Sequence, residues 1–304
     1  MALAPKISII TPSFNQGIYI EQTILSVLEQ DYPNIEYIII DGGSRDNTVE
    51  IIEKYEQKIS YWVSEKDKGQ TDAINKGLKR ATGDIIAFIN SDDYYEPGTF
   101  RKVAAAYEKG YDWIIGSVRN FKEATHEVEI IRQECNDRLL DWLIRKNKNH
   151  QPGNFWSARL MKDVGFLNED MHYSFDWEYW VRFVIKGYRP IVFNDELFTH
   201  FRLHETSKTV HNWRNFNPEY IAIMDRYKGV LTPPEARVVK AEITRLQLED
   251  NIHFARIASI HGRFAESWRL FMGAIRMKPL VVLSPKFLFE MMKALLYMPV
   301  RRLV

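Results

Sequence analysis

Short apolar runs alternate with helix-like segments through the first hundred residues, and this alternation constrains the fold more than any other feature of the chain. The apolar runs cover residues 6–14, 35–43, 59–65 and 84–93, and segments with apolar residues three and four apart cover 17–30, 46–57 and 69–83. Strands that alternate with short helices form a mostly parallel sheet with helices on both faces. We therefore expect an α/β fold, with Gly83 as the C-cap of the third helix.

The predicted strands end in polar and acidic residues. These ends read "TPSFN" at 11–15, "DGGS" at 41–44, "SEKD" at 64–67 and "SDD" at 91–93. In open α/β sheets, ligands bind beyond the carboxyl ends of the strands, so the polar ends predict one site along a single edge. The adjacent carboxylates of Asp92 and Asp93 repel each other, and they fit a turn, a helix N-terminus or a metal site.

Composition narrows the class of protein. The chain has 304 residues, of which 45% are hydrophobic, so it can bury a substantial core. A formal net charge of +1 gives no case for nucleic-acid binding. Cys135 is the only cysteine, which excludes an intramolecular disulfide and suits a reducing cytosol. The N-terminal segment does not read as a signal peptide, and no apolar run has the length of about 18 residues that a spanning helix needs. We therefore expect a cytoplasmic protein.

The pattern changes twice further along the chain. Expected strands at 111–118, 127–134 and 190–204 are mixed with expected helices at 137–146, 158–169 and 176–188. From about residue 213 the pattern is helical only, with a long helix behind Pro233 and Pro234. We therefore expect one unit over 1–212, with halves of about 1–100 and 101–212, and a helical unit over 213–304.

Seven motifs in register resemble the family 2 glycosyltransferases with the GT-A fold, as found in bacterial enzymes that build surface polysaccharides. They are "TPSFN", "DGGSRDNT", "DKGQTDAINKGLKRATGD", "NSDD", "HQPGNFW", "FDWEYWVRF" and "FRLHETSKT". The resemblance covers roughly residues 6–210. It implies a Rossmann-like GT-A sheet whose first half binds a nucleotide-diphosphate sugar and whose second half binds a glycan or lipid-linked acceptor. It also implies transfer of the sugar with inversion at the anomeric carbon.

A departing nucleotide diphosphate calls for a divalent cation, because Mn²⁺ and Mg²⁺ neutralise phosphate and accept carboxylate ligands. The resemblance implies that Asp93 is a metal ligand and that Asp92 contacts the metal or the ribose. It implies that His204 completes the metal site or contacts the departing diphosphate, with His200 as an alternative ligand. Many relatives have Asp where this chain has Asn90, so we expect Asn90 to be structural.

The resemblance also assigns residues to the donor. It places Thr11, Pro12 and Asn15 around the base, Asp41 at the base or ribose, Lys68, Gly69 and Asp72 in a loop under the nucleotide, and Arg202, Ser207 and Lys208 at the phosphates. The alternatives are an ordinary strand-to-helix loop at 11–15, a turn at Asp41 and a surface lysine at Lys68. Arg binds phosphate bidentately, which suits Arg202 to this role.

An inverting transfer needs a general base that deprotonates the acceptor hydroxyl. The motif "FDWEYWVRF" places Asp176 in this role, with Glu178 as the runner-up. Many relatives have Glu-Asp where this chain has Phe175 and Asp176. Helical spacing puts Asp176 and Trp180 on one face and Glu178 on the opposite one, which favours Asp176. We expect Trp180 to belong to the core, and His150 and Gln151 to lie on the acceptor side.

The C-terminal segment 284–304 is apolar and is flanked by basic residues, namely Lys286, Lys293, Arg301 and Arg302. It fits a helix that lies in the interface of an anionic membrane, or a helix that packs on the tail or on another subunit. The competing function is a non-catalytic sugar-nucleotide-binding or partner subunit on the same fold. The presence of Asp92, Asp93, Asp176 and His204 argues against this alternative. A nucleotidyltransferase would need a glycine-rich phosphate loop after the first strand, and "TPSFNQG" does not supply one.

Overall fold

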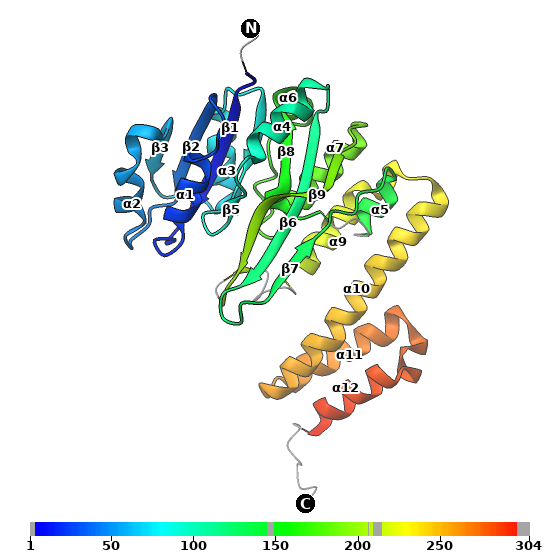
Figure 1. Ribbon diagram of the computed structural model, residues 1–304. Helices are drawn as coiled ribbons and strands as arrows, with labels where there is room; N and C mark the ends of the chain where they lie inside the picture. Colours follow the sequence, from blue (N-terminus) through cyan, green and yellow to red (C-terminus); the bar gives the residue numbers. More distant parts are fainter. Residues whose placement is uncertain (1–3, 145–148, 206, 209–214, 297–304) are drawn as a thin grey trace, which may run out of the picture. The chain divides into compact units, whose positions relative to one another are not determined.

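The computed structural model describes residues 4–144, 149–205, 207–208 and 215–296 (Figure 1). The chain divides into two compact units, residues 1–212 and 213–304. The dividing point falls within 209–214, outside the described residues.

The first unit is built on a nine-stranded sheet with the order β3-β2-β1-β4-β8-β6-β9-β5, in which β7 also pairs with β6. Its strands are β1 (Ile7–Ser13), β2 (Ile35–Asp41), β3 (Tyr61–Ser64), β4 (Ile85–Phe88), β5 (Tyr94–Tyr95), β6 (Trp113–Lys122), β7 (Val128–Ile131), β8 (Asn154–Ser157) and β9 (Ile191–Leu203). Strands β3, β2, β1 and β4 are all parallel, as the alternating pattern predicts. Their carboxyl ends therefore lie at one edge of the sheet (Figure 1).

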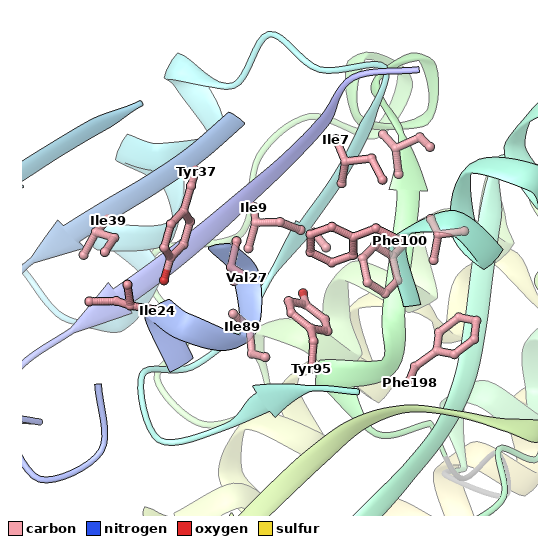
Figure 2. Packing of buried hydrophobic residues seen from close by; sticks show 14 of the residues in the cluster. Ile7, Ile9, Ile24, Val27, Tyr37, Ile39, Ile89, Tyr95, Phe100 and Phe198 are labelled. Atoms are coloured by element: carbon pink, nitrogen blue, oxygen red, sulfur yellow. The ribbon is translucent and has the colours of Figure 1, made fainter. Parts of the chain in front are cut away.

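The helices of the first unit cover both faces of the sheet. They are α1 (Ile20–Leu28), α2 (Thr48–Lys54), α3 (Gln70–Arg80), α4 (Thr99–Glu108), α5 (Leu139–Leu143), α6 (Ala158–Val164) and α7 (Phe175–Ile185), with short 3-10 helices at Glu56–Lys58 and Gln151–Gly153. On one face, Ile24 and Val27 of α1 pack with Ile9 of β1 in a fully buried cluster (Figure 2). On the other face, α3 approaches β1 so closely that a Cβ at Gly77 would lie 2.4 Å from Ile10.

A second, aromatic core lies around α7. Trp180 is 1% exposed and its ring stacks on that of Trp113, with centroids 5.7 Å apart. Trp156 of β8 and Phe183 of α7 pack edge-on against the same ring of Trp180. Trp180 is therefore a core residue, as expected.

Three local features differ from the sequence expectation. Strands β5 and β8 are additional, because two and four residues are too few to show a period. Gly83 is not a helix cap: α3 ends at Arg80, and Ala81 is the C-cap. Gly83 is instead required by close packing, since a Cβ there would lie 2.5 Å from Ser8 Oγ and 2.7 Å from the carbonyl oxygen of Lys6.

The segment between β7 and α5 carries the single cysteine. Cys135 is a free thiol of intermediate exposure. Burial raises the pKa of this thiol to about 12. The thiol is therefore protonated near neutral pH.

The second unit is helical over residues 215–296, as expected. It contains α9 (Phe216–Tyr227), α10 (Pro233–Ile260), α11 (Phe264–Met277) and α12 (Pro285–Leu296), with 3-10 helices at Lys228–Val230 and η5 (Pro279–Leu283). Thr232 and Glu235 form a capping box at the start of α10. Alanines at the buried positions 255, 274 and 294 let the helices pack closely around Phe271 and Phe287. Among the described residues, no helix has the length and apolar character needed to span a membrane.

Candidate active site

Asp41 organises the loop at the end of β2. Its buried carboxylate accepts hydrogen bonds from the amides of Gly43 (3.1 Å) and Ser44 (2.9 Å). It also accepts bonds from the hydroxyls of Ser44 (2.5 Å) and Ser64 (2.6 Å). Asp41 thus joins the ends of β2 and β3. Four hydrogen bonds within the protein therefore fix the orientation of this carboxylate.

The neighbouring loop at 67–69 is anchored by Asp72. Asp72 Oδ2 accepts a hydrogen bond from the amide of Lys68 (3.0 Å). Burial acts to raise the pKa of Asp72, but this amide and the charge of Lys76 outweigh it and lower the pKa. Gly69 has a φ of +122°, which favours glycine, and its amide donates to Asp67 Oδ1 (2.8 Å). The loop therefore has a defined shape before a nucleotide binds.

Of the residues at the end of β1 that we expected around the base, two are buried and one is exposed. Thr11 is fully buried, and its hydroxyl lies 3.2 Å from that of Tyr37, on the core side of the sheet. Pro12 is buried too. Neither side chain is exposed to a ligand, because β1 is covered on both faces. Asn15 is exposed with a φ of 52°, and its Oδ1 accepts from the amide of Arg45 (2.9 Å). Of the three residues expected at the base, Asn15 is the one that reaches the surface.

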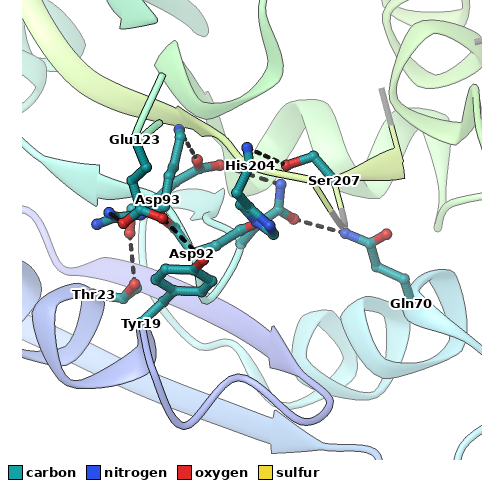
Figure 3. Close-up of polar contacts among 10 residues, drawn as sticks. Tyr19, Thr23, Gln70, Asp92, Asp93, Glu123, His204 and Ser207 are labelled. Carbon is teal, nitrogen blue, oxygen red and sulfur yellow. Dashed lines mark hydrogen bonds and ion pairs between the residues drawn. The ribbon is translucent and has the colours of Figure 1, made fainter. Parts of the chain in front are cut away.

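Asp92 and Asp93 have different surroundings, although they are adjacent (Figure 3). Asp92 Oδ2 lies 3.0 Å from His204 Nε2. Asp93 is 1% exposed, and its carboxylate accepts from the amide of Arg202 (2.9 Å) and from Asn90 Nδ2 (3.3 Å). Burial and the neighbouring charge of Asp92 raise the pKa of Asp93 well above the usual range of a carboxyl group. Asp93 is thus held inside the protein, while Asp92 faces the histidine.

The pair does not cap a helix. Helix α4 begins at Thr99 after Gly98, and strand β5 lies between it and the two aspartates. The helix N-terminus considered for the pair is therefore excluded.

Two of the three side chains expected to bind a divalent cation are arranged in a way that suits one. Within the described ranges, no three His, Cys, Asp or Glu side chains are grouped to hold a metal ion. Adjacent ligands of an octahedral cation with bonds of about 2.1 Å are about 3 Å apart. The 3.0 Å between Asp92 Oδ2 and His204 Nε2 is the length of a hydrogen bond between them, and it is also compatible with this spacing. These two residues suit a cation that takes its other ligands from phosphate and water, whereas Asp93 is engaged by Arg202 and Asn90.

His200, the alternative metal ligand, has other partners. Its Nε2 lies 2.6 Å from Glu96 Oε2, and its ring stacks on Tyr94 with centroids 4.2 Å apart. Burial lowers its pKa, although Glu96 opposes this effect. The structure therefore favours His204.

Arg202, Ser207 and Lys208, which we expected at the phosphates, have different hydrogen-bond partners. The Arg202 side chain is almost buried, and its guanidinium bonds to Asp92, Glu123 and Gln22. Protein groups therefore engage each nitrogen of the guanidinium that we expected at the phosphates. The amide of His204 donates to Ser207 Oγ (3.1 Å), so Ser207 orients the histidine. Lys208 Nζ donates to Gln70 Oε1 (2.9 Å) and to the carbonyl oxygen of His172 (3.2 Å).

Gln70, which we did not single out, connects three parts of the site. It is the first residue of α3, and its Nε2 donates to Asn90 Oδ1 (2.7 Å). It thereby joins Lys208 to the end of β4. Asn90 is structural, as expected, since it bonds to both Gln70 and Asp93.

Helix α7 begins near the same edge of the sheet. The rings of Phe175 and Phe88 have centroids 6.2 Å apart, so the start of α7 lies beside the end of β4. Asp176 is partly exposed in the first turn of α7. Glu178 is buried and pairs with Arg182 (3.0 Å), so its carboxylate is engaged inside the protein. This geometry favours Asp176 over Glu178 as the base.

The two acceptor-side candidates precede β8. Gln151 Nε2 donates to the carbonyl oxygen of Phe88 (2.7 Å), which places Gln151 against the end of β4. The amide of His150 donates to Gln133 Oε1 (2.9 Å), and burial lowers the pKa of its imidazole.

A mixed α/β sheet with two loops and an acidic pair at the carboxyl ends of its parallel strands is typical of nucleotide-binding α/β proteins. The model of the family "Glycosyl transferase family 2" matches residues 8–164, just over half of the chain. The chain therefore belongs to glycosyl transferase family 2, and it is a transferase enzyme.

Relatives agree with this family. An uncharacterised glycosyltransferase of Rickettsia typhi is 26% identical over 252 residues, which cover 78% of this chain and 76% of that protein. The teichuronic acid biosynthesis glycosyltransferase TuaG of Bacillus subtilis, itself described as putative in function, is 42% identical over 101 residues, 32% of this chain. That match spans only 40% of TuaG.

Solved structures support the fold. TarS of S. aureus in complex with UDP-GlcNAc superposes with a TM-score of 0.65 at 19% identity, over 96% of this chain and 89% of that one. A mannosyltransferase of Pyrobaculum calidifontis in complex with GDP-Man and Mn²⁺ superposes with a TM-score of 0.59 at 16% identity, over 97% of this chain and 86% of that one. The GT-A fold is thus confirmed.

Proposed function

We propose that this protein transfers a sugar, with inversion, from a nucleotide-diphosphate sugar to a glycan or lipid-linked acceptor, and that a divalent cation assists it. The observation that carries the proposal is the Asp92–His204 pair, 3.0 Å apart, at the sheet edge that also holds the Asp41 and Asp72 loops. A bound cation would neutralise the diphosphate as it leaves. Asp92 and His204 would hold that cation.

The donor would lie along the carboxyl edge of the parallel strands. Asn15 and the loops shaped by Asp41 and Asp72 are the candidates for contact with the nucleoside. Lys208 brings a positive charge to the loop that carries His204. TarS was solved with UDP-GlcNAc and the mannosyltransferase with GDP-Man and Mn²⁺, which supports a nucleotide-sugar donor and a cation here.

Asp176 would be the general base. It would take the proton from the acceptor hydroxyl while the hydroxyl oxygen attacks the anomeric carbon and the bond to the diphosphate breaks. Its partly exposed place in the first turn of α7 leaves the carboxylate within reach of an acceptor. Relatives such as TuaG and the poly(ribitol-phosphate) transferase TarS support a surface polysaccharide or related polymer as the acceptor.

A nucleotide-sugar screen with Mn²⁺ tests this function. We expect one nucleotide sugar to raise the melting temperature of the wild type, and chelation with EDTA to reduce the shift. We expect Asp92→Ala to remove the metal-dependent part, while Asp195→Ala, at an exposed position in β9, leaves it intact. A donor that binds but is neither hydrolysed nor transferred would instead support the non-catalytic binding subunit.

We further propose that the protein works in the cytoplasm, at the inner face of the cytoplasmic membrane. Helix α12 has apolar residues on two opposite faces: Phe287 and Ala294 are buried, whereas Phe289 and Met292 are 55% and 62% exposed. The adjoining η5 exposes Leu283. Large apolar side chains that are exposed together on the outer face of a helix favour contact with a partner.

Charge supports an anionic lipid surface as this partner. Residues 278–304 contain one acidic residue, and that residue, Glu290, pairs with Arg256 (3.3 Å). The basic residues of the same segment are Lys278, Lys286, Lys293, Arg301 and Arg302, of which the last two lie outside the described residues. Lys293 Nζ lies 4.1 Å from the ring centroid of Phe289, beside the exposed apolar face. Interfacial helices combine apolar and basic side chains in this way.

Sedimentation with lipid vesicles tests the membrane proposal. We expect the wild type to bind vesicles that contain phosphatidylglycerol and to be released by salt, whereas deletion of 284–304 abolishes binding. Binding that survives the deletion, or its absence in the wild type, would overturn the proposal. A deletion that changes the oligomeric state instead would assign this face to a second copy of the chain.

A further inference from the structure

Arg202 binds both aspartates of the pair. Its main-chain amide donates to Asp93 Oδ1 (2.9 Å), and its side-chain Nε donates to the carbonyl oxygen of Asp92 (3.0 Å). One residue of β9 therefore holds the carboxylate of Asp93 and the backbone of Asp92.

The rest of the guanidinium is enclosed. Its two terminal nitrogens donate to Glu123 Oε1 and Gln22 Oε1. The rings of Tyr19 and Phe121 each lie with their centroid 4.8 Å from the guanidinium carbon. Arg202 as a whole is 7% exposed. These partners leave the guanidinium little surface that is open to a phosphate.

The contacts of Arg202 form a closed circuit, which includes Asp92 and His204, the two proposed cation ligands. Tyr19 donates its hydroxyl to Glu123 Oε2 (3.0 Å), and its ring packs on His204 with centroids 4.8 Å apart. His204 in turn lies 3.0 Å from Asp92. Starting from Arg202, the contacts therefore run through Glu123, Tyr19, His204 and Asp92 and return to Arg202. Figure 3 labels the four residues other than Arg202.

We propose that Arg202 is a positioning residue, which holds Asp92 against His204 and so preorganises the cation site, and that it is not a phosphate ligand. The inference rests on the proposed function, because it takes Asp92 and His204 as the cation ligands. Residues that orient metal ligands typically change metal affinity by about 10- to 100-fold when they are mutated. The guanidinium suits this role, since its three nitrogens each bond to a different acceptor, which the single nitrogen of lysine does not reproduce.

The test measures Mn²⁺ affinity without activity, by electron paramagnetic resonance, in the wild type, Arg202→Lys and Glu123→Gln. We expect about a tenfold loss of affinity in Arg202→Lys and a smaller loss in Glu123→Gln. Two matched controls should keep the wild-type affinity: Arg101→Lys, at an exposed pair with Asp31, and Glu127→Gln, at an exposed pair with Lys122. Circular dichroism checks folding, and Glu123→Gln serves if Arg202→Lys does not fold.

A second measurement separates positioning from phosphate binding. The affinities of UDP and of uridine are compared in the presence of EDTA. A positioning role predicts that Arg202→Lys leaves the ratio of the two affinities within about twofold of that of the wild type. If Arg202 binds phosphate instead, we expect Arg202→Lys to lower the ratio of UDP affinity to uridine affinity by about tenfold and to keep the Mn²⁺ affinity. One lost charge-assisted bond is worth about 1.5 kcal/mol. That fall in the ratio would overturn the inference alone, whereas a wild type that binds no Mn²⁺ would overturn the metal site as well.

Discussion

The two units of this protein place their charged and apolar side chains in opposite ways. In the first unit several charged groups are buried, among them Asp41, Asp93, Glu178 and Arg202. In the described part of the second unit, no Asp, Glu, Lys or Arg is buried, but most of the large exposed apolar residues of the protein lie there. Burying a charge is costly unless hydrogen bonds compensate it, and exposing large apolar side chains is costly unless a partner covers them. The first pattern is typical of a unit that holds a polar site, and the second agrees with the contact surface proposed above.

If the first unit carries the chemistry, the largest loss of activity should come from a substitution of Asp176. We expect Asp176→Asn to lower kcat by about 100- to 10,000-fold, as is usual for loss of a general base. KM for the donor should change little, because Asp176 acts on the acceptor. Steady-state kinetics against both substrates measures this, with Asp195→Asn as an exposed control. A loss of less than tenfold would remove Asp176 from the role of base.

Asp92→Ala should have the next largest effect. A cation at a departing diphosphate contributes several kcal/mol, so we expect transfer to fall by at least about 100-fold. Excess Mn²⁺ should restore part of the activity if the metal site is weakened and not destroyed. Activity that resists both the substitution and EDTA would contradict the assignment of the metal site.

A third comparison uses one ion pair within a helix from each unit. Glu178 and Arg182 of α7 are 2% and 19% exposed, whereas Glu242 and Arg245 of α10 are 27% and 51% exposed. Removing one partner of a buried pair typically costs about 3 kcal/mol, and an exposed pair contributes less than about 1 kcal/mol. We therefore expect Glu178→Ala to lower the free energy of unfolding far more than Glu242→Ala does. Urea denaturation measures both, and equal losses would mean that burial does not separate the two units in this respect.

The smallest effect on catalysis should come from the exposed apolar face of α12. We expect Phe289→Glu to leave transfer to a soluble acceptor within about twofold. We expect it to lower binding to anionic vesicles by about tenfold, because a charge replaces an exposed aromatic side chain that lipid would cover. Ile130→Glu is the matched control, since Ile130 is 57% exposed on β7 in the first unit. If both substitutions weaken vesicle binding equally, the second unit has no special role at the membrane.

The parts of the fold that follow a local period were predictable from the sequence. Strands β1 to β4, the helices between them and the helical second unit all follow from spacing within a few residues. Strands β5 and β8 do not, because they are too short for a period and form only through pairing with distant strands.

In the site too, contacts between residues far apart in the sequence could not be predicted from a local pattern. The strand-end rule predicts that Asp41 and Asp92 lie on one edge, because it needs only the strand order. It does not predict that Arg202 bonds to Gln22, which is 180 residues away along the chain, or to Glu123, which is 79 away. Thr11 was assigned to the pocket because of its motif, yet the alternation of side chains along β1 points it into the core.

Cys135 has a practical consequence for experiments on this protein. Thiol-reactive dyes attack the thiolate, and a thiol with a pKa of about 12 contributes almost none of that form near neutral pH. Cys135 therefore takes up little dye, and the unmodified chain gives a low background in fluorescent labelling. A cysteine introduced at the exposed position of Met292 would take up an environment-sensitive dye selectively, and its emission would report directly whether α12 enters lipid.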